Sequence, residues 1–202
     1  MRDRENLSQL TQLDPDYIGF IFYPPSPRFV GNDFPVEIPG SVSKSERTGV
    51  FVNMSSDEVL DRMIKYKLDA AQLHGSESPE SCEFIRDKGY KVIKAFQVDE
   101  FFNFDILKPY EQVTDYFLFD TKTIKYGGSG KKFDWSVLRN YSLQKPFFLS
   151  GGIGPDDIEE IEKIDLPSIF ALDLNSKFEI IHGMKNISLL KQFIGDIRAK
   201  MI

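Results

Sequence analysis

The chain has a single cysteine, Cys82, and two histidines among its 202 residues. One cysteine excludes an internal disulfide and any metal site made of several cysteines, and two histidines give no support to a histidine-rich metal site. A net charge of −6 and the absence of any basic run longer than Lys131-Lys132 argue against a nucleic-acid surface. No apolar run approaches the roughly 20 residues of a membrane helix, and the polar N-terminus does not resemble a signal peptide. The composition therefore predicts a cytoplasmic protein that binds neither membrane nor nucleic acid.

Seven apolar, β-rich runs recur along the chain without a linker or a shift in composition between them. They lie at residues 17–23, 48–52, 70–73, 92–96, 116–119, 146–149 and 168–172. Several are apolar almost throughout, which is typical of strands covered on both faces. A chain of this length without a linker predicts one domain, residues 1–202.

Helical patterns lie between most of these runs. Ser55-Ser-Asp-Glu58 is a candidate capping box, and Ser78-Pro79 has the pattern of an N-cap followed by proline at the first helical position. Apolar stripes at helical spacing occupy residues 156–164 and 186–197, and a helix-like stretch precedes the first strand. Alternation of strand and helix predicts an α/β fold around a parallel sheet, either doubly wound or a (β/α)₈ TIM barrel. A barrel begins on a strand, so a chain of this pattern lacks the first one.

Polar residues follow the apolar runs at the edge where α/β folds carry their functional groups. Asp120 ends the fifth run, where a carboxylate is costly to bury without a partner. The sequence favours a catalytic role of Asp120 and a hydrogen bond within the loop equally. Gly151-Gly152 suggests a phosphate-binding loop, although a pair of glycines also makes a tight turn. Arg28 could clamp a carboxylate or be an ordinary surface arginine, and His74 is more often structural than a base.

Seven segments, in order and in register, resemble the phosphoribosylanthranilate isomerase family. They are Gly19-Phe-Ile-Phe-Tyr-Pro-Pro-Ser-Pro-Arg28, Gly49-Val-Phe-Val-Asn53, Gln72-Leu-His-Gly75, Phe119-Asp-Thr-Lys122, Gly127-Gly-Ser-Gly-Lys131, Phe133-Asp-Trp135 and Leu149-Ser-Gly-Gly-Ile153. The resemblance implies a (β/α)₈ barrel that catalyses an Amadori rearrangement in tryptophan biosynthesis. The reaction uses no cofactor or metal.

The resemblance also implies roles for particular residues. Asp120 takes the position of the general acid, and Arg28 that of the arginine that meets the anthranilate carboxylate. The further substrate-binding positions, which include the phosphate loops, are His74, Gly128, Gly151, Gly152, Asp173, Asn175 and Ser176. The last loop reads Asn175-Ser-Lys-Phe-Glu179 where the family often has Ser-Ser-Gly-Val-Glu, so phosphate contacts there are expected to differ in detail.

The general base of the family is a cysteine in a Lys-Ile/Val-Cys-Gly motif at the end of the first strand, and this sequence has no such motif. Cys82 lies in an expected helix, away from the strand ends. We expect that the start codon has been placed too late and that the 202-residue form has a much reduced activity. We also expect that the missing strand leaves an unpaired sheet edge, so that the barrel is destabilised, rearranged or closed by a second copy. A phosphosugar-binding barrel without catalysis is the alternative, and another phosphosugar barrel enzyme is a third.

Overall fold

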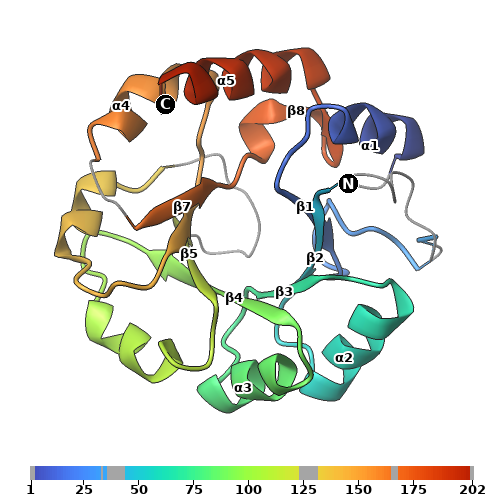
Figure 1. Ribbon diagram of the computed structural model, residues 1–202, viewed down its shortest axis with the longest axis vertical. Helices are drawn as coiled ribbons and strands as arrows, with labels where there is room; N and C mark the ends of the chain where they lie inside the picture. Colours follow the sequence, from blue (N-terminus) through green and yellow to red (C-terminus); the bar gives the residue numbers. More distant parts are fainter. Residues whose placement is uncertain (1–2, 33, 36–43, 123–131, 165–167, 201–202) are drawn as a thin grey trace.

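The computed structural model describes residues 3–32, 34–35, 44–122, 132–164 and 168–200, and its centre is a seven-stranded parallel sheet curled into a ring (Figure 1). The strands are hydrogen-bonded in the order of the sequence, from β1 to β7. Their bounds are β1 Tyr17–Ile21, β2 Glu46–Phe51, β3 Ala70–Leu73, β4 Lys91–Val98, β5 Tyr116–Thr121, β6 Phe147–Leu149 and β7 Ile169–Leu172. All seven predicted strands are therefore present.

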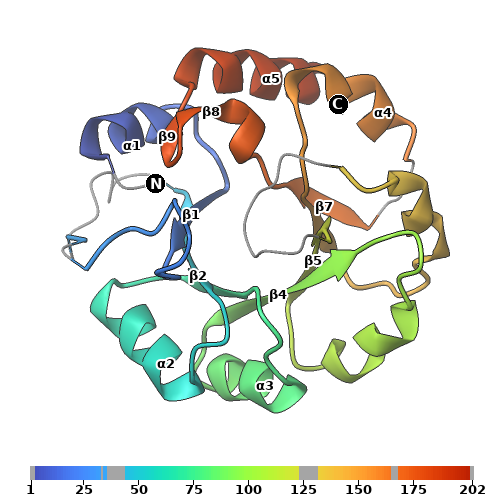
Figure 2. The same ribbon diagram turned by 180° about the vertical axis from the view of Figure 1, so that it is seen from behind.

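Helices surround the sheet on its outer side, as Figures 1 and 2 show from opposite directions. The α-helices are α1 Arg4–Thr11, α2 Ser56–Lys65, α3 Pro79–Asp87, α4 Ile158–Glu162 and α5 Ile187–Lys200. Four 3₁₀ helices accompany them: η1 Phe104–Tyr110, η2 Trp135–Asn140, η3 Pro155–Asp157 and η4 Ser176–Phe178. A small antiparallel hairpin of β8 Glu179–Ile181 and β9 Met184–Lys185 lies between η4 and α5.

The helix starts follow from the local signals in the sequence. The side chain of Ser55 accepts from the amide of Glu58, and the Glu58 carboxylate accepts in return from the amide of Ser55, which completes the predicted capping box of α2. Ser78 caps α3 with proline at its start. Between β4 and β5 the connection is the 3₁₀ helix η1, which contains Pro109; a proline inside a helix removes a donor and disfavours a regular α-helix.

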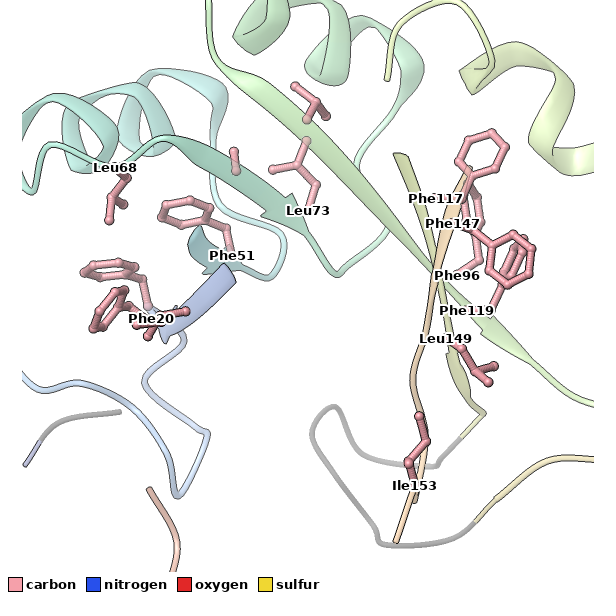
Figure 3. Close-up of a cluster of buried hydrophobic side chains, with 14 of the residues drawn as sticks. Phe20, Phe51, Leu68, Leu73, Phe96, Phe117, Phe119, Phe147, Leu149 and Ile153 are labelled. Atoms are coloured by element: carbon pink, nitrogen blue, oxygen red, sulfur yellow. The ribbon is translucent and has the colours of Figure 1, made fainter. Parts of the chain in front are cut away.

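The two faces of the sheet bury different residues because side chains alternate along each strand. The outer face packs against the helices through large aromatic residues, and the centroids of the Phe119 and Phe147 rings lie 4.9 Å apart (Figure 3). The inner face carries Ala95 and Leu118 together with the aromatic Phe148. Leu118 and Phe148 also line a cavity inside the ring.

The ring of strands has its two ends at β1 and β7, and within the described residues these strands do not pair with each other. Helix α5 crosses this side of the molecule and contacts α1 (Figures 1 and 2). The arrangement is a TIM-barrel-like α/β fold with seven described parallel strands. Among the described residues, no helix combines the length and the apolar character needed to cross a membrane.

Candidate active site

A cavity of about 420 Å³ opens inside the ring, and it gathers the predicted site residues. Those that line it are Arg28, His74, Asp120, Gly151, Gly152, Asp173, Asn175 and Ser176. Gly128 is the remaining predicted residue, and it lies outside the described residues. These eight residues lie on one cavity although they are spread over 149 positions of the chain, from Arg28 to Ser176.

Three neighbouring strand ends place Asp120, Ser150 and Asp173 side by side. The amide of Ser150 donates to the carbonyl of Phe119 at 2.9 Å, and the amide of Asp173 donates to the carbonyl of Leu149 at 2.8 Å. These bonds continue the ladder from β5 through β6 to β7, so the polar residues that follow the strands share one edge.

The Asp120 carboxylate has a polar neighbour at each of its oxygens. Its Oδ1 accepts from the amide of Thr121 at 2.8 Å, and its Oδ2 lies 3.2 Å from Nε2 of His74. The other ring nitrogen of His74, Nδ1, lies 2.7 Å from the side-chain nitrogen of Gln72. The carboxylate is therefore held in one orientation, with 17% of its side chain exposed at the cavity wall.

Gly151 permits the close approach of the β6 loop to Asp120. Its φ of +93° is a conformation that side chains disfavour, and a Cβ there would lie 2.3 Å from Oγ1 of Thr121 and 3.1 Å from Oδ1 of Asp120. Gly152 also has a positive φ, of 70°. Both glycines therefore shape the loop, and Gly151 is required by space as well as by conformation.

Asp173 carries a second carboxylate beside Asp120. Its Oδ2 accepts from the hydroxyl of Ser150 at 2.9 Å. Burial raises the pKa of Asp173, and repulsion from the Asp120 charge raises it further, against the opposing effects of Ser150 and the Lys185 charge. Asp120 and Asp173 are therefore neighbouring carboxyl groups of the cavity wall with different surroundings, an arrangement frequent in acid–base catalysis.

Arg28 is held over the cavity by the loop after β1 and by an ion pair. The amide of Val30 donates to the carbonyl of Ile21 at 3.0 Å, which folds the loop back onto its own strand. The Arg28 guanidinium then meets the Glu179 carboxylate, with Nη2 to Oε2 at 2.7 Å and Nε to Oε2 at 2.8 Å. Glu179 was not singled out from the sequence as a partner, because nothing in a pattern links residues 151 positions apart.

Lys185 is a second cation of this region. Its Nζ donates to Oδ1 of Asn175 at 2.8 Å and lies 3.6 Å from Oε1 of Glu179. Burial lowers the pKa of Lys185, although the Glu179 and Asp173 carboxylates oppose this effect. For Glu179 burial acts upward, but the Arg28 hydrogen bonds and the Lys185 charge outweigh it and lower the pKa of the carboxyl. The sequence offered no signal for Lys185.

A buried ion pair supports the neighbouring strand ends. Nζ of Lys94 lies 3.1 Å from Oε2 of Glu77 and also donates to the carbonyls of Leu73 and Gly75. Glu77 in turn accepts from the amide of Asn53 at 2.8 Å. The pair therefore joins the ends of β2, β3 and β4. A lysine inside an apolar strand was the available signal for this network.

Cys82 lies on α3, fully buried, and is not among the residues that line the cavity. Burial raises the pKa of its thiol to about 12, against the effect of the Lys94 charge. It is thus a packing residue, as its position in the helix predicted. Among the described residues no cluster of three or more histidine, cysteine, aspartate or glutamate side chains has the geometry of a metal site.

The family model for N-(5'phosphoribosyl)anthranilate (PRA) isomerase matches residues 1–196. The chain belongs to the phosphoribosylanthranilate isomerase family. An N-(5'-phosphoribosyl)anthranilate isomerase from Parabacteroides distasonis is 44% identical over 200 residues, which is 98% of this chain and 90% of that protein. The resemblance found in the sequence motifs is thereby confirmed, and the chain is an aldose–ketose isomerase of tryptophan biosynthesis.

Solved phosphoribosylanthranilate isomerases have the same fold. The Thermus thermophilus structure has a TM-score of 0.85 at 28% identity and covers 98% of this chain and 96% of that one. A structure in complex with reduced 1-(o-carboxyphenylamino)-1-deoxyribulose 5-phosphate has a TM-score of 0.82 at 29% identity, with 98% and 95% coverage. A third, of monomers obtained from the dimeric Thermotoga maritima protein, has a TM-score of 0.79 at 32% identity, again with 98% and 95% coverage.

Proposed function

We propose that the chain converts N-(5'-phosphoribosyl)anthranilate into 1-(o-carboxyphenylamino)-1-deoxyribulose 5-phosphate with Asp120 as general acid. The position of Asp120 carries the proposal: its carboxyl faces the cavity at the end of β5, and both oxygens are fixed by hydrogen bonds. A proton given to the ribose ring oxygen lets the C1′–O bond break while the anthranilate nitrogen forms a Schiff base. Removal of the C2′ proton then gives an enolamine, which takes a proton at C1′ and loses the proton of its C2′ hydroxyl to become the ketone.

Arg28 is proposed to bind the anthranilate carboxylate. Glu179 occupies the Nε and Nη2 edge of the guanidinium, so a second carboxylate would approach the end formed by Nη1 and Nη2. The ion pair with Glu179 supports this role because it fixes the plane of the guanidinium before the substrate arrives. His74, next to Asp120 on the cavity wall, is proposed as a further substrate-binding residue.

The phosphate is proposed to bind near the ends of β6 and β7, at Gly151 and Gly152 and at Asp173, Asn175 and Ser176. The Lys185 ammonium supports this placement because it is hydrogen-bonded to Asn175, at 2.8 Å. The amide of Gly154 already donates to Oδ2 of Asp157 at 2.6 Å. Within the loop after β6, phosphate binding is therefore assigned to groups before Gly154. Gly128 keeps the same proposed role, from the sequence motif alone.

The general base is proposed to lie on a strand between β1 and β7 that completes the barrel. Two observations support this: β1 and β7 are the ends of the sheet order, and the cavity is lined both by these strands and by α5 residues such as Leu190 and Phe193. In-frame coding sequence upstream of Met1 with a Cys-Gly pair would support the assignment. A stop codon directly upstream, or full turnover by the 202-residue chain, would contradict it.

We further propose that the chain forms one domain, that it is cytoplasmic, and that it self-associates at the β1–β7 side. The dimeric origin of the Thermotoga maritima monomers supports self-association. Light scattering of the purified chain tests self-association, and a monomer across the concentration range would contradict it.

The catalytic proposal is tested by following product formation from freshly prepared phosphoribosylanthranilate, together with growth of a tryptophan auxotroph. We expect Asp120→Asn to lower turnover roughly 10²–10⁴-fold, while Asp105→Asn, on the exposed surface, leaves it unchanged. Binding of the product without any turnover or growth would favour the alternative, a phosphosugar-binding barrel without catalysis.

A further inference from the structure

Gln72 lies on β3, His74 directly follows the end of that strand, and both line the cavity. They are two positions apart, so in a strand their side chains point to the same side of the sheet. Gln72 is 9% exposed and its amide nitrogen lies 2.7 Å from Nδ1 of His74. This short contact joins a buried amide to a ring nitrogen that faces away from Asp120.

His74 reaches Asp120 across the strand between them. Leu73 pairs with Lys94 in the register of β3 and β4, so Ala95 follows at the level of His74. The methyl group of Ala95 leaves space for the imidazole to cross β4 toward β5. As a result Nε2 of His74 lies 3.2 Å from Oδ2 of Asp120.

A neutral imidazole has one N–H donor and one acceptor nitrogen, so the group that contacts one nitrogen determines which of the two carries the proton. An amide N–H of Gln72 directed at Nδ1 requires that nitrogen to accept. The ring proton then belongs on Nε2, directed at Asp120. The carboxyl groups that face the ring are Asp120, in contact, and Asp173, whose charge also acts on it.

We propose that Gln72 is a positioning residue that confines the proton of His74 to Nε2. The inference rests on the proposed role of Asp120 as general acid. With Nε2 protonated, His74 cannot accept the proton of Asp120 through their 3.2 Å contact, so His74 does not compete with the substrate for it.

The same tautomer assists after the proton has left. The Asp120 carboxylate then has an N–H donor at each oxygen, from the amide of Thr121 and from Nε2 of His74. Donors already in place stabilise the developing charge without reorganisation. The opposite tautomer would present a lone pair to the carboxylate and repel it.

The test uses the low histidine content of the chain. Because His74 and His182 are its two histidines, His182→Asn leaves a single imidazole whose ¹⁵N shifts and couplings report the tautomer. In this background we expect a protonated Nε2 and an unprotonated Nδ1. Gln72→Glu presents a carboxylate that can only accept, so a proton should appear on Nδ1. Gln97→Glu is the control: it adds the same charge on the inner face beside Asp120, in register on β4, and should leave Nδ1 unprotonated.

Turnover gives the second readout. We expect Gln72→Glu to lower kcat roughly 10–100-fold with little change in KM, as for residues that orient a catalytic group. Gln72→Met, of similar size, removes the donor and keeps the packing, and it should lower kcat less. A protonated Nδ1 in the starting protein, or a tautomer unchanged by Gln72→Glu, would overturn the inference. The tautomer is measured without turnover, so it decides the inference by itself, whereas equal turnover of Asp120→Asn and the unmutated chain would count against the proposed function.

Discussion

At the scale of single residues, Gly151 has the tightest surroundings in the site. An alanine there would have a strained φ of +93° and a Cβ 2.7 Å from the amide nitrogen of Thr121. We expect Gly151→Ala to destabilise the fold by about 1–3 kcal/mol and to lower turnover, because the loop would displace Asp120. Urea unfolding and the isomerase assay measure the two effects.

Gly89→Ala is the matched control for this change. Gly89 has a φ of +86° at the end of α3, but nothing lies within 4 Å of its Cβ position. We expect Gly89→Ala to lose only the stability that a side chain at this φ costs, and to keep full turnover. Equal effects of the two variants on turnover would show that crowding against Asp120 is unimportant.

Asp173 should make the stability of the chain depend on pH. Its pKa is raised in the folded state above the ordinary value of 3.8, so the folded chain binds more protons than the unfolded one above that pH. Stability should therefore fall as pH rises from about 4 through the raised pKa. Asp173→Asn keeps an acceptor for the Ser150 hydroxyl and removes this loss.

Unfolding free energies of both forms at about pH 4 and about pH 7 check this prediction. The difference between Asp173→Asn and the unmutated chain should grow in favour of the variant as pH rises. If the difference in unfolding free energy between the two forms is constant with pH, or grows in favour of the unmutated chain, ionisation of Asp173 does not destabilise the fold.

At the scale of elements, α1 is attached to the C-terminal hairpin by the side chain of one residue. Asn6 is buried; its amide nitrogen donates to the carbonyl of Lys185 at 2.8 Å, and its Oδ1 accepts from the amide of Lys185 at 2.7 Å. Asn6→Ala leaves both backbone groups of Lys185 without these partners. We expect a loss of about 2–4 kcal/mol of stability, measured by urea unfolding.

Two variants on α1 separate the possible causes of this loss. Gln9→Ala, on the exposed side of α1, should change stability by less than about 0.5 kcal/mol. Asn6→Asp keeps the acceptor for the Lys185 amide and loses the donor. Its loss of stability should therefore lie between those of Gln9→Ala and Asn6→Ala. A small effect of Asn6→Ala would mean that α1 is held by its apolar contacts alone.

Most elements of this fold could be predicted because their signals are local. Apolar runs gave the seven strands, Ser55 and Glu58 gave the start of α2, and the order of strand ends gave the positions of Asp120 and Asp173. Hydrogen bonds between distant elements have no such pattern. Asn6 and Lys185 are 179 positions apart, and no spacing rule connects them.

At the scale of the whole molecule, Arg28 and Glu179 join the loop after β1 to the hairpin that follows β7. Their side chains are 5% and 4% exposed, and Glu179 is the carboxylate that compensates the buried charge of Arg28. The pair lies on the same side of the ring as the two ends of the sheet, β1 and β7. Its contribution to the integrity of the ring should therefore exceed that of a surface ion pair.

We expect Arg28→Met to destabilise the chain by about 3 kcal/mol, because the buried Glu179 carboxylate loses its closest counter-charge and keeps only Lys185, at 3.6 Å. The double variant Arg28→Met with Glu179→Met removes both charges of the pair, so it should regain part of this loss. The exposed pair of Lys108 and Asp105, at 67% and 72% exposure, is the control, and Lys108→Met should change stability by less than about 0.5 kcal/mol. Urea unfolding of the unmutated chain, Arg28→Met, Glu179→Met and the double variant gives the coupling energy. Equal losses in the single and double variants would show that the packing of the two side chains, and not their charges, holds this side of the ring together.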